Sequence, residues 1–345
     1  MFKTDYMETR REFIQKSASL SLGTLLSGWA FGALGNDKYG EVLPLRTITR
    51  TGEKTTAFAL GGYHMSLSLN PSKAQKLIER SMELGIRFYD TARGYQKGVS
   101  EEYYGKYLSP KYRDDVFLMT KSPAQTREVA NQNLNDSLRA LKTERLDLWQ
   151  MHNVRSIADV DQRISEGVLD FFLEAKAKGK TRYIGFTVHA NPKVGIYFLD
   201  QLQKRGIELD TCQMPVNVCD ASYLSFQKEL LPVLLEKKYG VIAMKTMAGG
   251  GIIGRRFDLT SEKIKDEEIP NVVKEGGISF EKLHQYVYSM PVSALCSGCE
   301  TIDELEKNIN VLKGLRKLSK KEMEAIAEMA RPFGGELGEH YKRIL

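Results

Sequence analysis

The chain has few cysteines, and their arrangement excludes several kinds of site. Four cysteines occur in 345 residues, too few for a disulfide-based fold, and a chain of this length can bury a sizeable core without them. Cys296 and Cys299 form a single C-x2-C pair, whereas structural zinc sites need a second pair of ligands. No four-cysteine run follows, so neither an iron–sulfur cluster nor another metal site is expected. Two interpretations remain: a redox dithiol, and small side chains lining a strand end, which we favour.

The chain also lacks a block of basic residues. Its 50 lysines and arginines exceed its 44 acidic residues by enough to give a net charge of +6, but this excess is spread along the whole chain. A protein that follows a phosphate backbone gathers its positive charge on one face or in one segment. Binding to nucleic acid is therefore not expected.

No apolar run is long and hydrophobic enough for a permanent membrane helix. The uncharged stretch at residues 17–34 is only moderately apolar and is interrupted by glycines. It follows the pair Arg10-Arg11, and this pattern resembles the twin-arginine export signal. We therefore expect residues 1–34 to be a signal peptide for the twin-arginine export machinery, and the mature protein to be periplasmic without a stable membrane anchor. The alternative is a plain amphipathic helix.

After residue 50, short apolar runs alternate with amphipathic segments. The expected strands cover residues 57–63, 86–91, 116–121, 146–152, 181–188, 209–217, 241–246 and 294–297. The expected helices cover residues 70–84, 100–108, 127–141, 167–177, 194–204, 226–238, 280–289 and 302–312, with a last helix at 320–330. Near-continuous apolar strands that alternate with helices indicate a parallel sheet covered by helices.

Eight such units without a break in composition predict an α/β fold of the (β/α)8 TIM barrel type over residues 45–335, followed by a tail at 336–345. A doubly wound sheet is the runner-up. That fold would carry a G-x-G-x-x-G fingerprint after its first strand. Here Gly61-Gly62 is followed by Tyr63-His64-Met65, so the fingerprint is absent.

Polar residues end three consecutive expected strands. Asp90, Lys121 and His152 each close an apolar run, and Tyr95 lies in the loop after Asp90. Function in a (β/α)8 barrel resides at the carboxyl ends of the strands, so these side chains are expected to meet at the mouth of the barrel. Each alone has a structural explanation, such as capping a turn or ending a strand in solvent. Their joint occurrence favours a catalytic group.

The same residues carry a family resemblance. The segment Asp90-Thr-Ala-Arg-Gly-Tyr95, followed by Glu102 three residues before Gly105, resembles the signature of the aldo-keto reductases. Lys121 and His152 match the next two signature positions in order, and the resemblance runs from about residue 45 to 330. It implies that the protein transfers a hydride between a nicotinamide cofactor and a carbonyl or alcohol substrate. Tyr95 would be the general acid or base, with Lys121 lowering its pKa, Asp90 holding Lys121, and His152 orienting the carbonyl oxygen.

The resemblance also implies where the cofactor binds. The turn Gly61-Gly62-Tyr63 is expected near the nicotinamide, with Gln213 and Thr187 holding its carboxamide. The family usually has Asn where Val188 stands, so one amide contact is in doubt. His189 is a candidate either to replace that contact or to reach the substrate, and a loop histidine with no ligand is the alternative.

The other end of the cofactor is expected beside the last two strands. Lys245, with the glycines at 249–251, suits a pyrophosphate, and the adenosine-phosphate segment is matched by Gly298, Cys299 and Asn308. Many relatives that prefer NADP grip its 2′-phosphate with a basic residue where Glu304 stands here, and an acidic group repels that phosphate. The arginines at 255–256 would compensate. The expected cofactor is NADP(H) or NAD(H). We slightly favour NADP(H), because many proteins of the family that this chain resembles prefer it.

The resemblance implies that the substrate is a small carbonyl compound or alcohol. The sequence does not identify which one, because pocket loops in such barrels vary freely. Arg93 and Asn153, besides His189, are candidates to line its pocket, whereas Trp149 is expected to pack in the barrel wall. The alternative function is a non-enzymatic regulatory or binding protein that kept the barrel and the nucleotide site. The intact tetrad argues against it, because a pure binder has no use for Tyr95.

Overall fold

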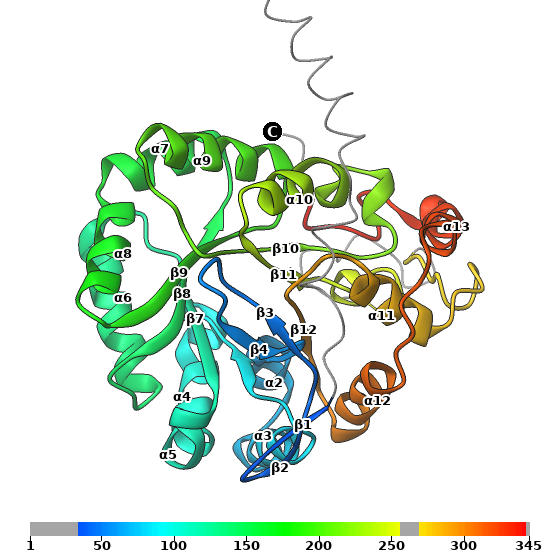
Figure 1. Ribbon diagram of the computed structural model, residues 1–345, viewed down its shortest axis with the longest axis horizontal. Helices are drawn as coiled ribbons and strands as arrows, with labels where there is room; N and C mark the ends of the chain where they lie inside the picture. The colour runs from blue at the N-terminus through cyan, green and yellow to red at the C-terminus, as the bar shows by residue number, and fades with distance from the viewer. Residues whose placement is uncertain (1–33, 256–268, 343–345) are drawn as a thin grey trace, which may run out of the picture.

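The computed structural model of the chain describes residues 34–255 and 269–342 (Figure 1). The predicted signal peptide at 1–34 lies outside the described residues except for Leu34, and so does Arg256. Among the described helices, none has the length and apolar character needed to cross a membrane.

Eight parallel strands form a closed barrel in the order β10-β11-β12-β5-β6-β7-β8-β9. The strands are β5 (Phe58–Gly61), β6 (Phe88–Asp90), β7 (Phe117–Ser122), β8 (Leu146–Val154), β9 (Thr181–Val188), β10 (Thr211–Pro215), β11 (Gly240–Met244) and β12 (Ala294–Gly298). Each pairs with its neighbours in the sequence, and β12 pairs with β5 to close the cylinder. The (β/α)8 fold expected from the sequence is confirmed.

The barrel interior is filled by apolar side chains at the amino ends of the strands. Phe88, Phe117 and Leu148 belong to this inner cluster, and so does Ile48 from the segment between β3 and β4. Two short antiparallel pairs precede the barrel, formed by β1 (Gly35–Asp37) with β2 (Gly40–Val42) and by β3 (Leu45–Thr47) with β4 (Lys54–Thr56). The β3–β4 hairpin covers the amino-terminal end of the barrel (Figure 1). Its close approach explains Gly240, where a Cβ atom would lie 1.6 Å from the Ile48 carbonyl oxygen.

Helices surround the strands and bury the second, larger apolar layer. They are α2 (Gly62–Ser68), α3 (Pro71–Glu83), α4 (Val99–Tyr107), α5 (Ser109–Tyr112), α6 (Arg127–Ala140), α7 (Ile157–Ser165), α8 (Val168–Ala177), α9 (Pro192–Lys204), α10 (Phe226–Glu236), α11 (Phe280–Ser289), α12 (Ile302–Lys313) and α13 (Lys320–Ala330). Side-chain caps set many of their starts. At the start of α3, for example, Asn70 accepts from the Lys73 amide at 3.0 Å.

Helices α2 and α7, together with the four-residue α5, differ from the sequence-based expectation. The expected first strand ends early, because Gly62 and Tyr63 open α2 instead of continuing β5. A side chain at Gly62 would collide with Ser100, whose Oγ lies 2.2 Å from the ideal Cβ position. Helix α7 was not expected. It has an amphipathic pattern and an N-cap, Ser156, but only nine residues, which is short for recognition by periodicity.

The chain after α13 returns to the carboxyl face of the barrel. Lys342 is fully buried between two carboxylates, 2.7 Å from Asp220 Oδ1 and 2.9 Å from Glu339 Oε1. Burial raises the pKa of Asp220 to about 6, although Lys342 opposes the change. Asn217 donates to Glu339 and, at 3.4 Å, to the Lys245 carbonyl at the end of β11. The predicted tail is thus anchored, as far as Lys342, to the loops after β10 and β11.

We expect Lys342→Met to lower the free energy of unfolding by about 3–5 kcal/mol, because it leaves two buried carboxylates without a cation. Denaturant unfolding followed by circular dichroism measures the change. Lys320→Met is the matched control, since the Lys320 side chain is 91% exposed, and it is expected to stay within about 0.5 kcal/mol of wild type. Equal stability of the two variants would contradict the buried clamp.

Candidate active site

Strand pleating brings the predicted catalytic residues to one place. Side chains two apart on a strand share a face, so interior Met119 is followed by interior Lys121 on β7. On β8 the same spacing places His152 four residues after interior Leu148. Asp90 ends the neighbouring strand β6. These ends open into a cavity of about 1270 Å³ that Asp90, Tyr95 and His152 line.

Lys121 is the centre of the polar network. Its ammonium forms an ion pair with Asp90 Oδ1 and donates to the Thr91 carbonyl at 2.8 Å. It also lies 3.3 Å from the Tyr95 hydroxyl. Burial alone would lower the pKa of Lys121, but the charges of Asp90 and Tyr95 outweigh it and raise that pKa above its ordinary value. Lys121 therefore stays charged although its side chain is only 1% exposed.

Tyr95 lies at the cavity end of this network. Burial raises the pKa of its hydroxyl to about 12, while Lys121 pulls it down. The expected lowering by Lys121 is present, but burial outweighs it in the free protein, so the net direction is upward. A tyrosine with this pKa keeps its proton at neutral pH, as a general acid for carbonyl reduction requires.

His152 lies beside Tyr95, with 5.8 Å between the ring centroids. Burial lowers its pKa well below the ordinary value, and the charges of Lys121 and Arg163 add to the effect. The ring is therefore neutral at pH 7. A neutral imidazole offers one N–H donor and one acceptor, which suits an uncharged carbonyl oxygen next to the Tyr95 hydroxyl.

Two buried polar atoms without hydrogen-bond partners mark the next part of the site. Gln213 on β10 and Thr187 on β9 are paired in register. Gln213 Oε1 and Thr187 Oγ1 are both buried without a partner among the described residues. One is an acceptor and the other a hydroxyl donor, and a carboxamide needs one of each. The residues present therefore fit a nicotinamide, as expected from the sequence.

The cavity continues past β11 and β12 toward α11 and α12. Lys245 lines it with a left-handed backbone conformation (φ 55°) directly after β11. Gly298 faces His64, whose ring would collide with any added Cβ at 2.0 Å. Farther on, Asn308 donates to Ser297 at 3.4 Å, while its Oδ1 is buried without a partner in the described chain. This long, partly polar groove has room for a dinucleotide.

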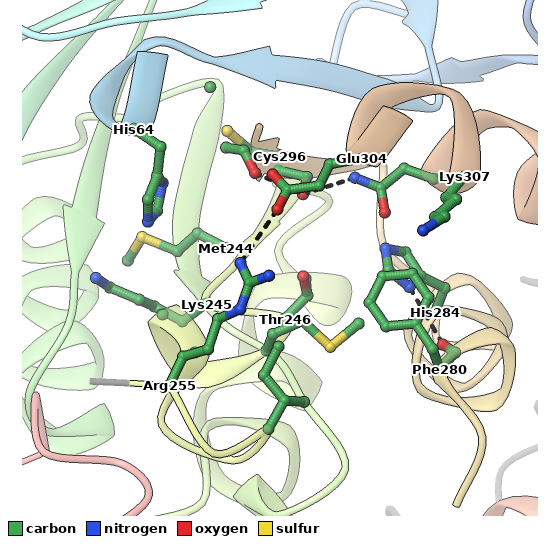
Figure 2. A pocket seen from close by; sticks show the side chains of 18 of the residues that line it. His64, Met244, Lys245, Thr246, Arg255, Phe280, His284, Cys296, Glu304 and Lys307 are labelled. Atoms are coloured by element: carbon green, nitrogen blue, oxygen red, sulfur yellow. Dashed lines mark hydrogen bonds and ion pairs between the residues drawn. The ribbon is translucent and has the colours of Figure 1, made fainter. Parts of the chain in front are cut away.

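Arg255 and Glu304 face each other across the far part of this cavity (Figure 2). Arg255 Nη1 lies 3.1 Å from Glu304 Oε1, and Glu304 Oε2 accepts from the Glu300 amide at 2.9 Å. Glu304 was expected to repel a 2′-phosphate. The ion pair balances its charge, and Lys307 lines the same region.

The structure separates the remaining predicted residues into three groups. Those that line the cavity, besides the residues above, are Gly61, Tyr63 and His189. Two predicted residues are next to the lining but not part of it. Gly62 follows Gly61 at the start of α2, and Cys299 accepts a hydrogen bond from Asn308. Arg93 instead pairs with Glu101 and Asp136, and Asn153 lies in an irregular part of β8 away from the cavity lining.

Cys296 is a neighbour of the network that sequence reasoning did not assign to it. Its Sγ lies 3.0 Å from Asp90 Oδ2, and it lines the cavity. Its position two residues before Gly298 on β12 was the available signal. Burial raises the pKa of Cys296 well above the ordinary value, and raises that of Cys299 to about 12. Both thiols stay protonated, which weighs against a redox dithiol. Within the described part of the chain, no cluster of His, Cys, Asp or Glu suits a metal.

Trp149 packs in the barrel wall, as expected. It is fully buried and stacks on Phe172 of α8, with 3.6 Å between ring centroids and an angle of 4° between the planes. It faces outward from the barrel because it lies one residue after interior Leu148.

Comparison with known proteins agrees with this geometry. Similar proteins include the uncharacterised oxidoreductase YqkF of Bacillus subtilis (strain 168), 27% identical over 76% of this chain and 89% of its own length. The L-galactose dehydrogenase of Arabidopsis thaliana is 26% identical over 86% of this chain and 98% of its length.

Among solved structures, a holo-form aldo-keto reductase from Bacillus halodurans superposes with a TM-score of 0.67 at 23% identity, covering 86% of this chain and 99% of its own. That likeness supports the fold. The model of the aldo/keto reductase family matches residues 57–331. This range includes all eight barrel strands. The chain therefore belongs to the aldo/keto reductase family, a family of NAD(P)-dependent oxidoreductases.

Proposed function

We propose that this protein reduces a small carbonyl compound, or oxidises the matching alcohol, with Tyr95 as the general acid or base. The observation that carries the proposal is the contact of the Tyr95 hydroxyl with a buried, charged Lys121 that Asp90 holds in place. His152 stands beside Tyr95 on the cavity wall. Tyr95 can thus supply a proton, and the His152 ring a hydrogen bond, to a carbonyl oxygen at one point of the cavity.

In reduction, the carbonyl oxygen is placed between the Tyr95 hydroxyl and the His152 ring. A nicotinamide cofactor, when bound, would provide the hydride that the carbonyl carbon accepts. Tyr95 gives its proton to the oxygen as negative charge develops there, and the Lys121 ammonium stabilises the phenolate that is left. In oxidation the alcohol O–H gives its proton to the Tyr95 phenolate, and the hydride on the alcohol carbon would go to the oxidised cofactor. Thr187 and Gln213 would hold the carboxamide, with the turn at Gly61 and Gly62 beside it.

The substrate proposed is a small neutral carbonyl compound or alcohol. The neutral state of His152 supports an uncharged partner. One relative is an L-galactose dehydrogenase, which supports an alcohol rich in hydroxyl groups.

For the cofactor we favour NADP(H) over NAD(H). Arg255 lies in the far part of the cavity, and its ion pair with Glu304 occupies one nitrogen of a guanidinium that has five N–H donors. Arg255 and Lys307 would contact the 2′-phosphate, and Lys245 the pyrophosphate. The alternative is NAD(H), with Glu304 accepting from a ribose hydroxyl.

We also propose that the twin-arginine route exports the folded enzyme to the periplasm. Arg10-Arg11 and the uncharged stretch after them support this. Binding of the cofactor inside the cell before export would fit a nucleotide-dependent enzyme.

We expect Tyr95→Phe to lower kcat for carbonyl reduction on the order of 10²–10⁴-fold, because the proton donor is lost while the ring remains. Stopped-flow or steady-state absorbance of NADPH consumption measures the rate, and NADPH fluorescence checks that the cofactor still binds. Tyr107→Phe on α4 is the matched control, since Tyr107 does not line the cavity, and should keep the wild-type rate. Undiminished turnover in Tyr95→Phe would overturn the proposed mechanism.

We expect Arg255→Gln to weaken NADPH binding roughly ten-fold or more while leaving NADH binding nearly unchanged, because a charged contact to the 2′-phosphate is lost. Titration of intrinsic fluorescence gives both dissociation constants. Glu304→Gln should act in the opposite sense, strengthening NADPH binding. Tighter binding of NADH than of NADPH by the wild type, with no selective effect of Arg255→Gln, would favour NAD(H).

For export, we expect Arg10→Lys/Arg11→Lys to leave the protein in the cytoplasm of a bacterium that has the twin-arginine machinery, because that machinery reads the arginine pair. Cell fractionation and immunoblotting measure the distribution. Arg139→Lys, on the exposed face of α6, should export like wild type. A periplasmic double variant, or a cytoplasmic wild type, would refute the signal.

A further inference from the structure

His189 follows β9 directly and shares the face of that strand that lines the barrel interior. Thr187, two residues earlier, lies on that same face and carries one of the unpartnered buried atoms. Val188, between them, points outward and is fully buried in the helix-facing layer, within 3.4 Å of the Cβ position of Gly195 on α9. Val188 therefore has no route to the cofactor, whereas His189 lines the cavity.

His189 extends the row of polar rings that begins at Tyr95. The centroids of Tyr95 and His152 are 5.8 Å apart, and those of His152 and His189 are 5.5 Å apart. His189 lies beyond Thr187 in the chain direction, so it is closer to the mouth of the barrel than the proposed carboxamide site. A molecule that places its carbonyl oxygen between Tyr95 and His152 therefore passes within reach of His189.

The Nε2 atom of His189 is buried and has no hydrogen-bond partner among the described residues. Burying a polar atom without a hydrogen-bond partner is unfavourable, and a bound ligand that supplies the partner would remove this cost. Burial, with the nearby charges of Lys245 and Lys121, lowers the pKa of His189 well below its ordinary value. The ring is therefore neutral, with one donor and one acceptor. A hydroxyl group matches it, because a hydroxyl also donates and accepts.

The carboxamide of the cofactor does not need this ring. Thr187 and Gln213 already provide one donor and one acceptor at the position proposed for it. The unpartnered atom of His189 then faces the substrate. Because its ring is only 5.5 Å from that of His152, the group it binds must be a few bonds from the reacting carbonyl.

We propose that His189 is a substrate-binding residue that recognises a hydroxyl group adjacent to the reacting carbon, so that the preferred substrates are hydroxylated carbonyl compounds and their polyols. This inference rests on the proposed function. It adds a specificity-determining residue from β9 to the tetrad of Asp90, Tyr95, Lys121 and His152.

The test compares two aldehydes of equal chain length, glyceraldehyde and propanal, which differ in their hydroxyl groups. We expect the wild type to prefer glyceraldehyde in kcat/KM. His189→Phe keeps a ring but no hydrogen-bonding atom, and should lower kcat/KM for glyceraldehyde roughly 10- to 100-fold, mainly through KM, while propanal changes less than about three-fold. His189→Gln, which restores a donor and an acceptor, should recover part of the loss.

Controls separate this result from a general defect. His340→Phe removes an imidazole that does not line the cavity and should behave as wild type, and each variant must bind NADPH with wild-type affinity. Equal losses for both aldehydes, or none, would overturn the role of His189. A wild type that reduces both aldehydes without preference would overturn this inference alone. A wild type that binds the cofactor but reduces neither would overturn the proposed function as well.

Discussion

The buried ion pair of Lys121 and Asp90 is the interaction on which the rest of the site depends. An ammonium that is almost inaccessible to solvent is tolerable only because a carboxylate on the neighbouring strand and the Thr91 carbonyl satisfy it. Its charge then acts on Tyr95, where it partly offsets the effect of burial, and on His152, which it helps to keep neutral. The barrel supports this arrangement because the register of β6 against β7, which pairs Asp90 with Met119, places Asp90 close to Lys121 two residues further along β7.

Beyond that ion pair, the two ends of the cavity differ in charge. Near Tyr95 its polar groups are neutral rings and unpartnered atoms, suited to uncharged carbonyl, hydroxyl and amide groups. Near α12 its groups are charged, with Arg255 and Glu304 facing each other. A reduced nicotinamide dinucleotide has the same polarity, with an uncharged dihydronicotinamide ring at one end and phosphates toward the other. The fit is thus one of charge distribution along the whole groove.

The sequence predicted the barrel, and it predicted that Asp90, Lys121 and His152 would meet at one end of it, because both predictions rest on local, periodic signals. Apolar runs that end in Asp90, Lys121 and His152 can be read directly, since alternation on a strand fixes which side chains face inward. Arg93 shows the limit of such reading. It lies in the signature loop, yet the nearby acids Glu101 and Asp136 hold it, and no local pattern reveals partners on α4 and α6. Likewise, the direction in which the pKa of Tyr95 shifts depends on burial by segments that are distant in the sequence. The spacing of residues along the chain does not reveal this burial.

The buried Lys342 has a consequence for how the molecule is completed during synthesis. Domains form from the amino-terminal side as the chain emerges from the ribosome, and all eight strands precede α13. Until the segment that carries Glu339 and Lys342 has emerged, Asp220 lacks its cation, and Asn217 cannot bridge Glu339 to the end of β11. The loop that carries Lys245 is therefore secured last. A chain cut before Lys342 would therefore keep its barrel strands but lose the contacts that hold the loop after β11 in place.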